Sequence, residues 1–321
     1  NFSADFIKDK YFLINSLIFN SGSSEIILDK VKLNKNFEIL DLNKVKLKTY
    51  SNGAINNDLL IIKSDIIKIS GNIFDAEPLL KSLFSNEESK TFSKKFSNDI
   101  QVDFKKTITG TGDDVSDLSM IGTINSGSYQ KLILKGKFSK DEIVEMSVYQ
   151  IDKDKKTVQV ISDRARPFIE HFDFIEGFEG GKLDYESSLI NKKSTSNLTI
   201  TNFKVSKVPA LAQLLTLASL QGIADTLSGE GIRFDSFEMK SSSEGNVMNI
   251  EDTLAMGPAV SILLDGYVDK GKTVSLRGTL VPATKLNAII ASIPLLGDIL
   301  VGKKTGEGVV GVSFKMKGPP K

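Results

Sequence analysis

The sequence predicts a mainly β protein of the α+β class, in which antiparallel strands form a long sheet and a few short amphipathic helices cover it. Three observations support this fold class. Apolar residues alternate with polar ones at period two over most of the chain, which is typical of strands with one dry face. Asn and Gly interrupt these runs at short intervals, as they do in turns between strands. Helical spacing of apolar residues is confined to a few short segments, each of which follows a strand run.

The first strands are predicted within residues 10–71, where there is hardly any helical pattern. Short apolar runs are separated by turn residues at Asn20-Ser21-Gly22, at Asn34-Lys35-Asn36 and at Asn52-Gly53. This spacing predicts an antiparallel meander. Several runs are apolar at consecutive positions, which is expected where one face of a strand meets a helix or a ligand and the other meets more protein.

A first short helix is predicted over residues 75–84. Asp75 is placed to cap its N-terminus, and Pro78 falls in the first turn, where a missing N–H costs nothing. The same order of strand, proline and short apolar helix returns after Asp163, after Ser206 and after Val281. These four helices are expected to cover the sheet.

The longest of the four is predicted over residues 208–227, with Gly229 placed for a left-handed C-cap. Its apolar stripe is broad enough to lie on a sheet. Packing into the core is the plainer interpretation of this stripe, and closing one end of an apolar groove is the alternative. The residues of this possible groove cap are Leu211, Leu214, Leu215 and Ala218.

The middle of the chain contains the candidate boundary. Residues 85–117 are polar, with one strand predicted at residues 100–104, and two domains are predicted at 1–90 and 91–321. Alternating runs return between Ser128 and Ser162, and again at residues 183–189 and 198–205. Near the C-terminus, residues 273–281 and 310–316 each carry apolar residues on one face only.

Composition excludes several classes of function. The 41 Lys and Arg residues nearly balance the 40 Asp and Glu residues, so no global field would attract nucleic acid. Cysteine is absent, which removes disulfides, thiol nucleophiles and thiolate metal sites. The chain begins without Met and without a signal-peptide pattern, so we expect a fragment or a processed chain. The two most apolar segments, 208–224 and 288–302, are too short and too polar to cross a membrane.

Candidate chemical motifs are weak. The segment 297–304 resembles a phosphate-binding loop but lacks Ser or Thr after its lysine, so a helix end is the better interpretation. His171, the single histidine, has Glu170, Asp173 and Glu176 nearby, yet these carboxylates are not spaced to converge on one metal. A third candidate is a glycine-containing loop that bears Asp113, Asp114 and Asp117; it lacks the twelfth-position Glu of a calcium loop and predicts a turn. We therefore predict no enzyme activity, no metal and no cofactor.

One stretch carries a family resemblance. The string IEDTLAMGPAVSILLDGYVDKGKTVSLRGTLVPATKLNAIIASIPLLGDILVGKKTGEGVVGVSFKMKGPP, from Ile250 onward, resembles the C-terminal region of the AsmA-like (YhdP-type) envelope proteins of Gram-negative bacteria. The shared features are a GP after the first strand, RGTLVPA, an LN-led helix, IPLLG, GEG and a final GP. FDAEPLLKSL and PALAQLLTLASLQGIADTLSGEGIRFDSFE, earlier in the chain, also look like matching segments of that family.

The resemblance implies a long, curved sheet with an apolar groove, anchored in the inner membrane by an N-terminal helix and extending through the periplasm. It also implies phospholipid transport toward the outer membrane, with acyl chains as the ligand and envelope proteins as possible partners. A structural or assembly module that docks envelope proteins without carrying lipid is the alternative. From period two, the predicted lipid-groove residues are Val260, Ile262, Leu264, Val274, Leu276, Leu280, Val310, Val312 and Phe314.

Overall fold

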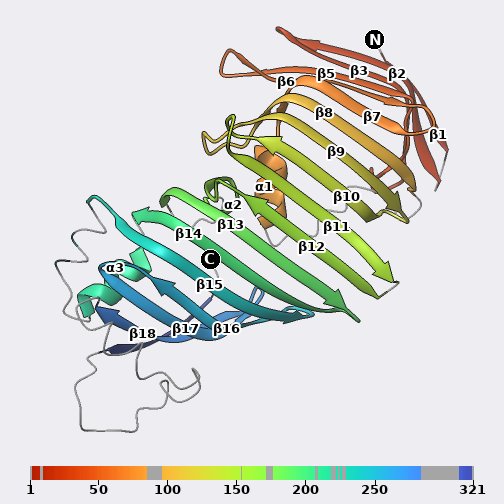
Figure 1. The fold of residues 1–321 in the computed structure, drawn as a ribbon. Coiled ribbons are helices and arrows are strands. Elements are labelled where there is room, and N and C mark those ends of the chain that lie inside the picture. The colour runs from red at the N-terminus through yellow and green to blue at the C-terminus, as the bar shows by residue number, and fades with distance from the viewer. Residues whose placement is uncertain are drawn as a thin grey trace. The chain divides into compact units, whose positions relative to one another are not determined.

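The computed structural model describes residues 2–7, 10–84, 96–152, 154–170, 176–206, 209–217, 222, 225, 229–282 and 311–319. Within these residues the protein contains nineteen strands and three short helices, so the mainly β fold class is confirmed. The chain forms two compact units, Asn1–Val160 and Ile161–Lys321 (Figure 1). The predicted boundary between residues 90 and 91 lies in the segment 85–95, outside the described residues, and stays a prediction.

The first unit is a sheet whose strands neighbour one another in chain order, with β4 and β5 both pairing with β3. Its strands are β1 (Phe2–Ile7), β2 (Tyr11–Ser21), β3 (Ser24–Leu33), β4 (Ile39–Asp41), β5 (Lys44–Ser51), β6 (Ala54–Lys63), β7 (Ile67–Asp75), β8 (Asn98–Ile108), β9 (Val115–Asn125), β10 (Ser128–Lys137), β11 (Ile143–Asp152) and β12 (Lys155–Ser162). The predicted meander over residues 10–71 is therefore confirmed.

One strand pair differs from the predicted antiparallel arrangement. Strands β7 and β8 run parallel, with Ile67 opposite Ile100 and Ile69 opposite Val102. Parallel neighbours need a connection that returns the chain to the starting end of the sheet. Helix α1 (Glu77–Phe84) is the described part of that connection. The sequence pattern could not reveal this pair, because period-two alternation is the same in parallel and antiparallel strands.

Helix α1 begins as its sequence predicts. The backbone N–H of Glu77 donates to Asp75 Oδ1 at 3.1 Å, which satisfies one of the free N–H groups of the first turn. Lys81 Nζ lies 2.6 Å from Glu77 Oε1 one turn along the helix, an ion pair exposed enough to add little stability. The hydrogen bond to Asp75 thus fixes the start of the helix, directly after β7.

The core of the first unit is a cluster of buried residues from β6 to β9. Phe74 and Phe104 stack within the same region, with ring centroids 4.9 Å apart. Seven buried side chains form the cluster, namely Leu59, Ile67, Phe96, Ile100, Val102, Phe104 and Ile124. Phe96 precedes β8 and belongs to this cluster, so the last part of the crossover connection packs against the sheet.

We expect Gly71→Ala to lower the free energy of unfolding by about 1–3 kcal/mol, the usual cost of overpacking. A Cβ at Gly71 would collide with the Asp58 carbonyl oxygen and lie 2.9 Å from Leu59 Cα, so the backbone of β6 would have to move. Gly318→Ala is the control, because a Cβ there meets nothing within 4 Å. Urea unfolding of the two variants checks this; equal midpoints would contradict the close approach of β6 and β7.

The second unit is also an open sheet in chain order, and its described pairs are antiparallel. Its strands are β13 (Glu176–Ile190), β14 (Lys193–Ser206), β15 (Ile232–Glu244), β16 (Val247–Met256), β17 (Val260–Asp269), β18 (Thr273–Pro282) and β19 (Val312–Gly318). Phe203 stacks between Phe178 and Phe234, with both centroid distances at 5.3 Å. This aromatic ladder joins β13, β14 and β15.

Two of the predicted helices in this unit are confirmed. Helix α2 (Arg166–Ile169) is a single turn before β13, and α3 (Pro209–Leu217) follows β14 (Figure 1). The predicted extension of α3 to residue 227 lies almost wholly outside the described residues, as does the helix predicted after Val281. The C-terminal end of β14 lies at the same end of the sheet as the N-terminal ends of β15 and β17, so α3 follows β14 at this end of the strands.

Candidate functional site

Cross-strand register in the first unit brings nine apolar residues into one continuous row. Residues directly opposite each other on neighbouring strands share a face of the sheet. The row contains Leu17, Leu28, Val45, Ile61, Ile69, Val102, Met120, Leu134 and Met146, from nine strands between β2 and β11. Eight strand spacings of about 4.8 Å give this row a length of about 38 Å. We call the face that carries it the apolar face.

The apolar face is only partly covered. Val102 is buried, but the other members of the row are half-buried, and Phe19 next to the row is 52% exposed. Tyr129 lies opposite Ile124 beside this face, and burial raises the pKa of its phenol. The phenol is therefore neutral at neutral pH. In the described part of the first unit, this half-buried apolar face is the main surface that could still contact a ligand or another protein.

The opposite face is polar. The residues next to those of the apolar row point to this opposite face, and the register aligns them in a second row. A few apolar residues interrupt this row, and its polar members are Lys46, Ser70, Asp103, Ser119, Lys135 and Glu145. Cross-strand ion pairs occur on this face, with Lys46 Nζ 2.6 Å from Glu25 Oε2 and Lys135 Nζ 2.9 Å from Glu145 Oε1. The sheet is thus amphipathic, and its two faces favour different surroundings.

Single residues with positive φ keep the apolar side chains on one face. Asp117 (φ 49°) and Asn202 (φ 56°) each lie inside a strand, and the buried or half-buried apolar residues stand two places before and one place after them. Strict alternation would send those two neighbours to opposite faces. The residue with positive φ shifts the alternation of side chains by one position, as a β-bulge does, so both apolar neighbours point to the same face.

The surroundings of two glycines, Gly136 and Gly181, show that the shifted residues share one face. A Cβ on Gly136 would meet Val115 and would lie 3.3 Å from Leu118 Cδ1, so the residues on either side of Asp117 point the same way. A Cβ on Gly181 would lie 3.1 Å from Phe203 Cβ and 3.2 Å from Ile200 Cγ2, the corresponding pair around Asn202. Ala165, just before α2, lies on the same side of β13, 3.3 Å from that position.

The second unit has its own apolar row, across seven strands. Its members are Leu183, Ile200, Phe237, Ala255, Ile262, Leu280 and Val312. The adjacent residues on the other face include Asp265, Arg277 and Lys315, and Arg277 Nε lies 2.8 Å from Asp265 Oδ2. The polar and apolar faces are therefore separated here in the same manner as in the first unit.

The predicted lipid-groove residues fall on this one face as far as the structure describes them. Register places Leu264 and Phe314 opposite Gly278, whose missing side chain leaves room for the Phe314 ring. Leu276 faces Gly266 and Met316 in the next row. Their role toward lipid stays a prediction. Of the nine, Val310 lies outside the described residues.

Exposure divides the predicted groove residues into two groups. Val260 and Leu280, at the edge where α3 emerges, are both 0% exposed and belong to the packed core. The others are half-buried, with part of each side chain open to solvent: Ile262, Leu264, Val274, Leu276, Val312 and Phe314. Only this second group offers surface to a ligand without a change in packing. Period two cannot separate the groups, because burial depends on what covers each end of the strands.

The predicted cap residues on α3 divide in the same way. Leu215 is fully buried and Leu211 nearly so, so this part of the stripe packs into the protein. Leu214 is half-buried, and Ala218 lies outside the described residues. These burials support the core-packing interpretation of α3 and are also compatible with its lying over one end of the apolar face.

The apolar face of the second unit ends in hydroxyl groups at the far ends of β13, β14 and β15. Ser187 lies opposite Ser196, and Ser196 lies opposite Ser241. Ser196 Oγ donates to Ser187 Oγ at 3.0 Å and lies 3.2 Å from the Tyr185 hydroxyl. The face is therefore more polar in this region than at the strand ends near α3, where Val260 and Leu280 are buried.

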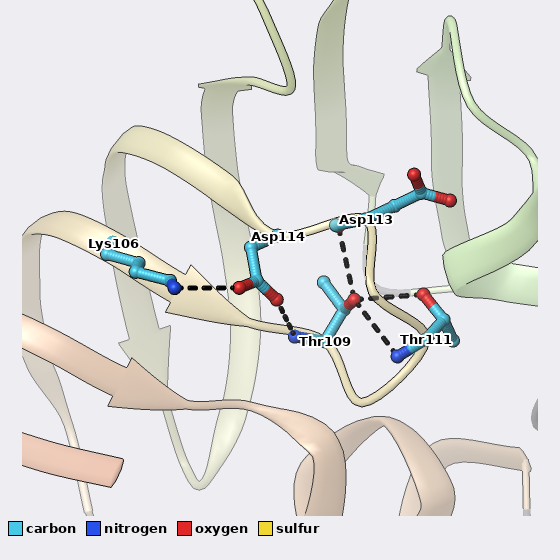
Figure 2. Close-up of polar contacts among 5 residues, drawn as sticks. All are labelled: Lys106, Thr109, Thr111, Asp113 and Asp114. Atoms are coloured by element: carbon cyan, nitrogen blue, oxygen red, sulfur yellow. Dashed lines mark hydrogen bonds and ion pairs between the residues drawn. The ribbon is translucent and has the colours of Figure 1, made fainter. Parts of the chain in front are cut away.

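The acidic loop between β8 and β9 is a self-bonded turn (Figure 2). Thr109 Oγ1 donates to the Asp113 carbonyl oxygen at 3.1 Å, and the Thr109 N–H donates to Asp114 Oδ1 at 3.3 Å. Lys106 Nζ lies 3.0 Å from Asp114 Oδ2. The Asp113 carboxylate points away from Asp114. The turn predicted from the sequence is confirmed, and these carboxylates do not converge on a cation.

Across the described ranges there is no cluster of His, Asp and Glu suited to a metal ion. No helix in those ranges is long and apolar enough to span a bilayer. His171 and the segment 297–304 lie outside the described residues, as does the apolar segment 288–302, which was predicted not to cross a membrane. The amphipathic sheet is therefore the feature of the described chain with the most evident capacity to bind something.

Comparison with known proteins gives no match: no family model, no curated protein and no solved structure is similar to this chain.

Proposed function

We propose that this chain is a non-enzymatic phospholipid-transport module that holds acyl chains on the apolar faces of its sheets. The observation that carries this proposal is the row of nine apolar residues across nine strands, most of them half-buried, from Leu17 to Met146. Burying one sixteen-carbon chain on such a surface would contribute on the order of 12 kcal/mol, at about 0.8 kcal/mol per CH₂. No catalytic group is needed for that.

The resemblance of the segment from Ile250 onward to AsmA-like envelope proteins supports the same proposal. On that basis we place the chain in the periplasm of a Gram-negative bacterium, as part of a protein anchored in the inner membrane. It would carry phospholipid between the inner and outer membranes. Envelope proteins would be its partners, and neither a cofactor nor nucleic acid would be involved.

The test is detergent-free purification of residues 1–321 after bacterial expression, followed by native mass spectrometry. We expect phospholipid bound in stoichiometric amounts, because a bare apolar face of this size is unfavourable in water. Lipid-free protein that also takes up none from phospholipid vesicles would contradict the proposal.

A second candidate function is a structural module that docks envelope proteins without carrying lipid. The complete burial of Val260, Leu280 and Leu215 favours it locally, since these side chains offer no surface to a ligand. A lipid-free particle that captures a defined envelope protein through the polar face would support this alternative. Bound phospholipid would favour transport.

A further inference from the structure

A lysine lies on the apolar side of β12. Along this strand Val158 is half-buried and Val160 buried, whereas Lys155 and Gln159 are exposed. Because successive side chains point to opposite faces, Lys156 shares the face of Val158 and Val160. Lys156 is itself half-buried. Its side chain therefore leaves the strand on the apolar side of the sheet and not on the polar side.

Lys156 differs from the lysines of the polar face in its partners. Lys46 and Lys135 each pair with a glutamate on a neighbouring strand. Within the described ranges no ion pair and no hydrogen bond joins the Lys156 ammonium to another side chain. Burial also lowers the pKa of Lys156. A partly desolvated cation without a counter-charge is costly, and such groups are concentrated at binding sites.

We propose that the Lys156 ammonium binds the phosphate of a phospholipid headgroup whose acyl chains lie along the apolar face of the first unit. This inference rests on the proposed lipid-transport function and adds the chemical class of headgroup. A lysine ammonium is a compact point charge suited to phosphate. A headgroup with net negative charge, such as phosphoglycerol, is favoured over phosphoethanolamine, whose own ammonium competes for the phosphate.

The position of Lys156 fits this orientation. It is the second residue of β12, so it stands near the rim of the sheet face. Val158 and Val160 continue the same face away from the rim. A phosphate at the rim would leave the polar headgroup near water while its chains extend over apolar side chains.

The test compares Lys156→Met with Lys155→Met, a neighbouring lysine on the other face. Each protein is incubated with vesicles that contain equal amounts of phosphatidylglycerol and phosphatidylethanolamine, and bound lipids are quantified by native mass spectrometry. We expect the wild-type protein and Lys155→Met to be enriched in phosphatidylglycerol by about tenfold, the scale of one charge-assisted hydrogen bond. Lys156→Met should bind as much lipid in total with the enrichment lost, and Lys156→Arg should retain it.

Lys156→Met is expected to fold. The pKa of Lys156 is lower in the folded protein than in the unfolded chain, so carrying the charge at neutral pH disfavours folding. Methionine keeps the apolar stem and removes the charge. The melting temperature of Lys156→Met should equal or exceed that of the wild-type protein. A change in lipid selectivity could then not be ascribed to unfolding.

Three outcomes would overturn the inference, and they can be told apart. Unchanged enrichment in folded Lys156→Met would refute the lysine's role and leave lipid transport standing. Absence of lipid from the wild-type protein would refute the transport function together with the inference. Stabilisation of lipid-free protein by inorganic phosphate, lost in Lys156→Met, would assign the lysine to free phosphate.

Discussion

Val312→Asp is expected to retain less than about one tenth of the lipid that copurifies with the wild-type protein, because an unpaired carboxylate on an apolar surface is strongly unfavourable. Val312 is half-buried and ends the seven-residue apolar row, opposite Leu280. It lies on β19, which pairs on one side with β18. Among the described strands, a charge on β19 therefore faces fewer neighbours than one at the centre of the sheet. Native mass spectrometry measures the loss directly.

Ser313→Asp is the matched control for this variant. Ser313 is the next residue of β19, is exposed, and lies opposite Thr279 on the polar side. The same charge is thus added one residue away on the other face. Lipid content in Ser313→Asp should equal that of the wild-type protein. If folded Val312→Asp keeps its lipid, or if both variants lose it alike, the assignment of this face to acyl chains is wrong.

Leu280→Ala is expected to lower the free energy of unfolding by about 2–5 kcal/mol, the usual cost of a large cavity in a packed core. Leu280 is fully buried and lies between Ile262 and Val312 in the apolar row. Leu276, on the same strand and the same face, is only half-buried. Leu276→Ala should therefore lose about 1 kcal/mol or less, since less area is removed from an already solvated side chain. Urea unfolding of the two alanine variants measures the difference.

The lipid content of these two variants should change in the opposite order. Leu276→Ala removes surface that a ligand can reach, whereas the Leu280 side chain offers none. A Leu276→Ala protein that is as destabilised as Leu280→Ala would show that the whole row is closed core. The structural-module hypothesis would then gain support, because the apolar face of β18 would offer no open surface to a ligand.

Much of this fold could be predicted from local pattern. The meander, the start of α1 beside Asp75 and the shared face of the predicted groove residues all follow from period two, turn residues and capping. These features depend on neighbouring residues, so one sequence contains the information. The resemblance to AsmA-like proteins added an expected function, which remains to be tested by the experiments above.

The sequence by itself determined that the protein is mainly β, that it has one apolar face and one polar face, and that short helices follow certain strands. Only the tertiary structure decided three further points: the parallel pairing of β7 and β8, the phase shifts at Asp117 and Asn202, and the separation of closed Leu280 from open Leu276. Strand direction, backbone handedness at a single residue and the burial of one side chain within a row all depend on contacts between remote parts of the chain. The alternation of side chains along one strand therefore cannot predict these features.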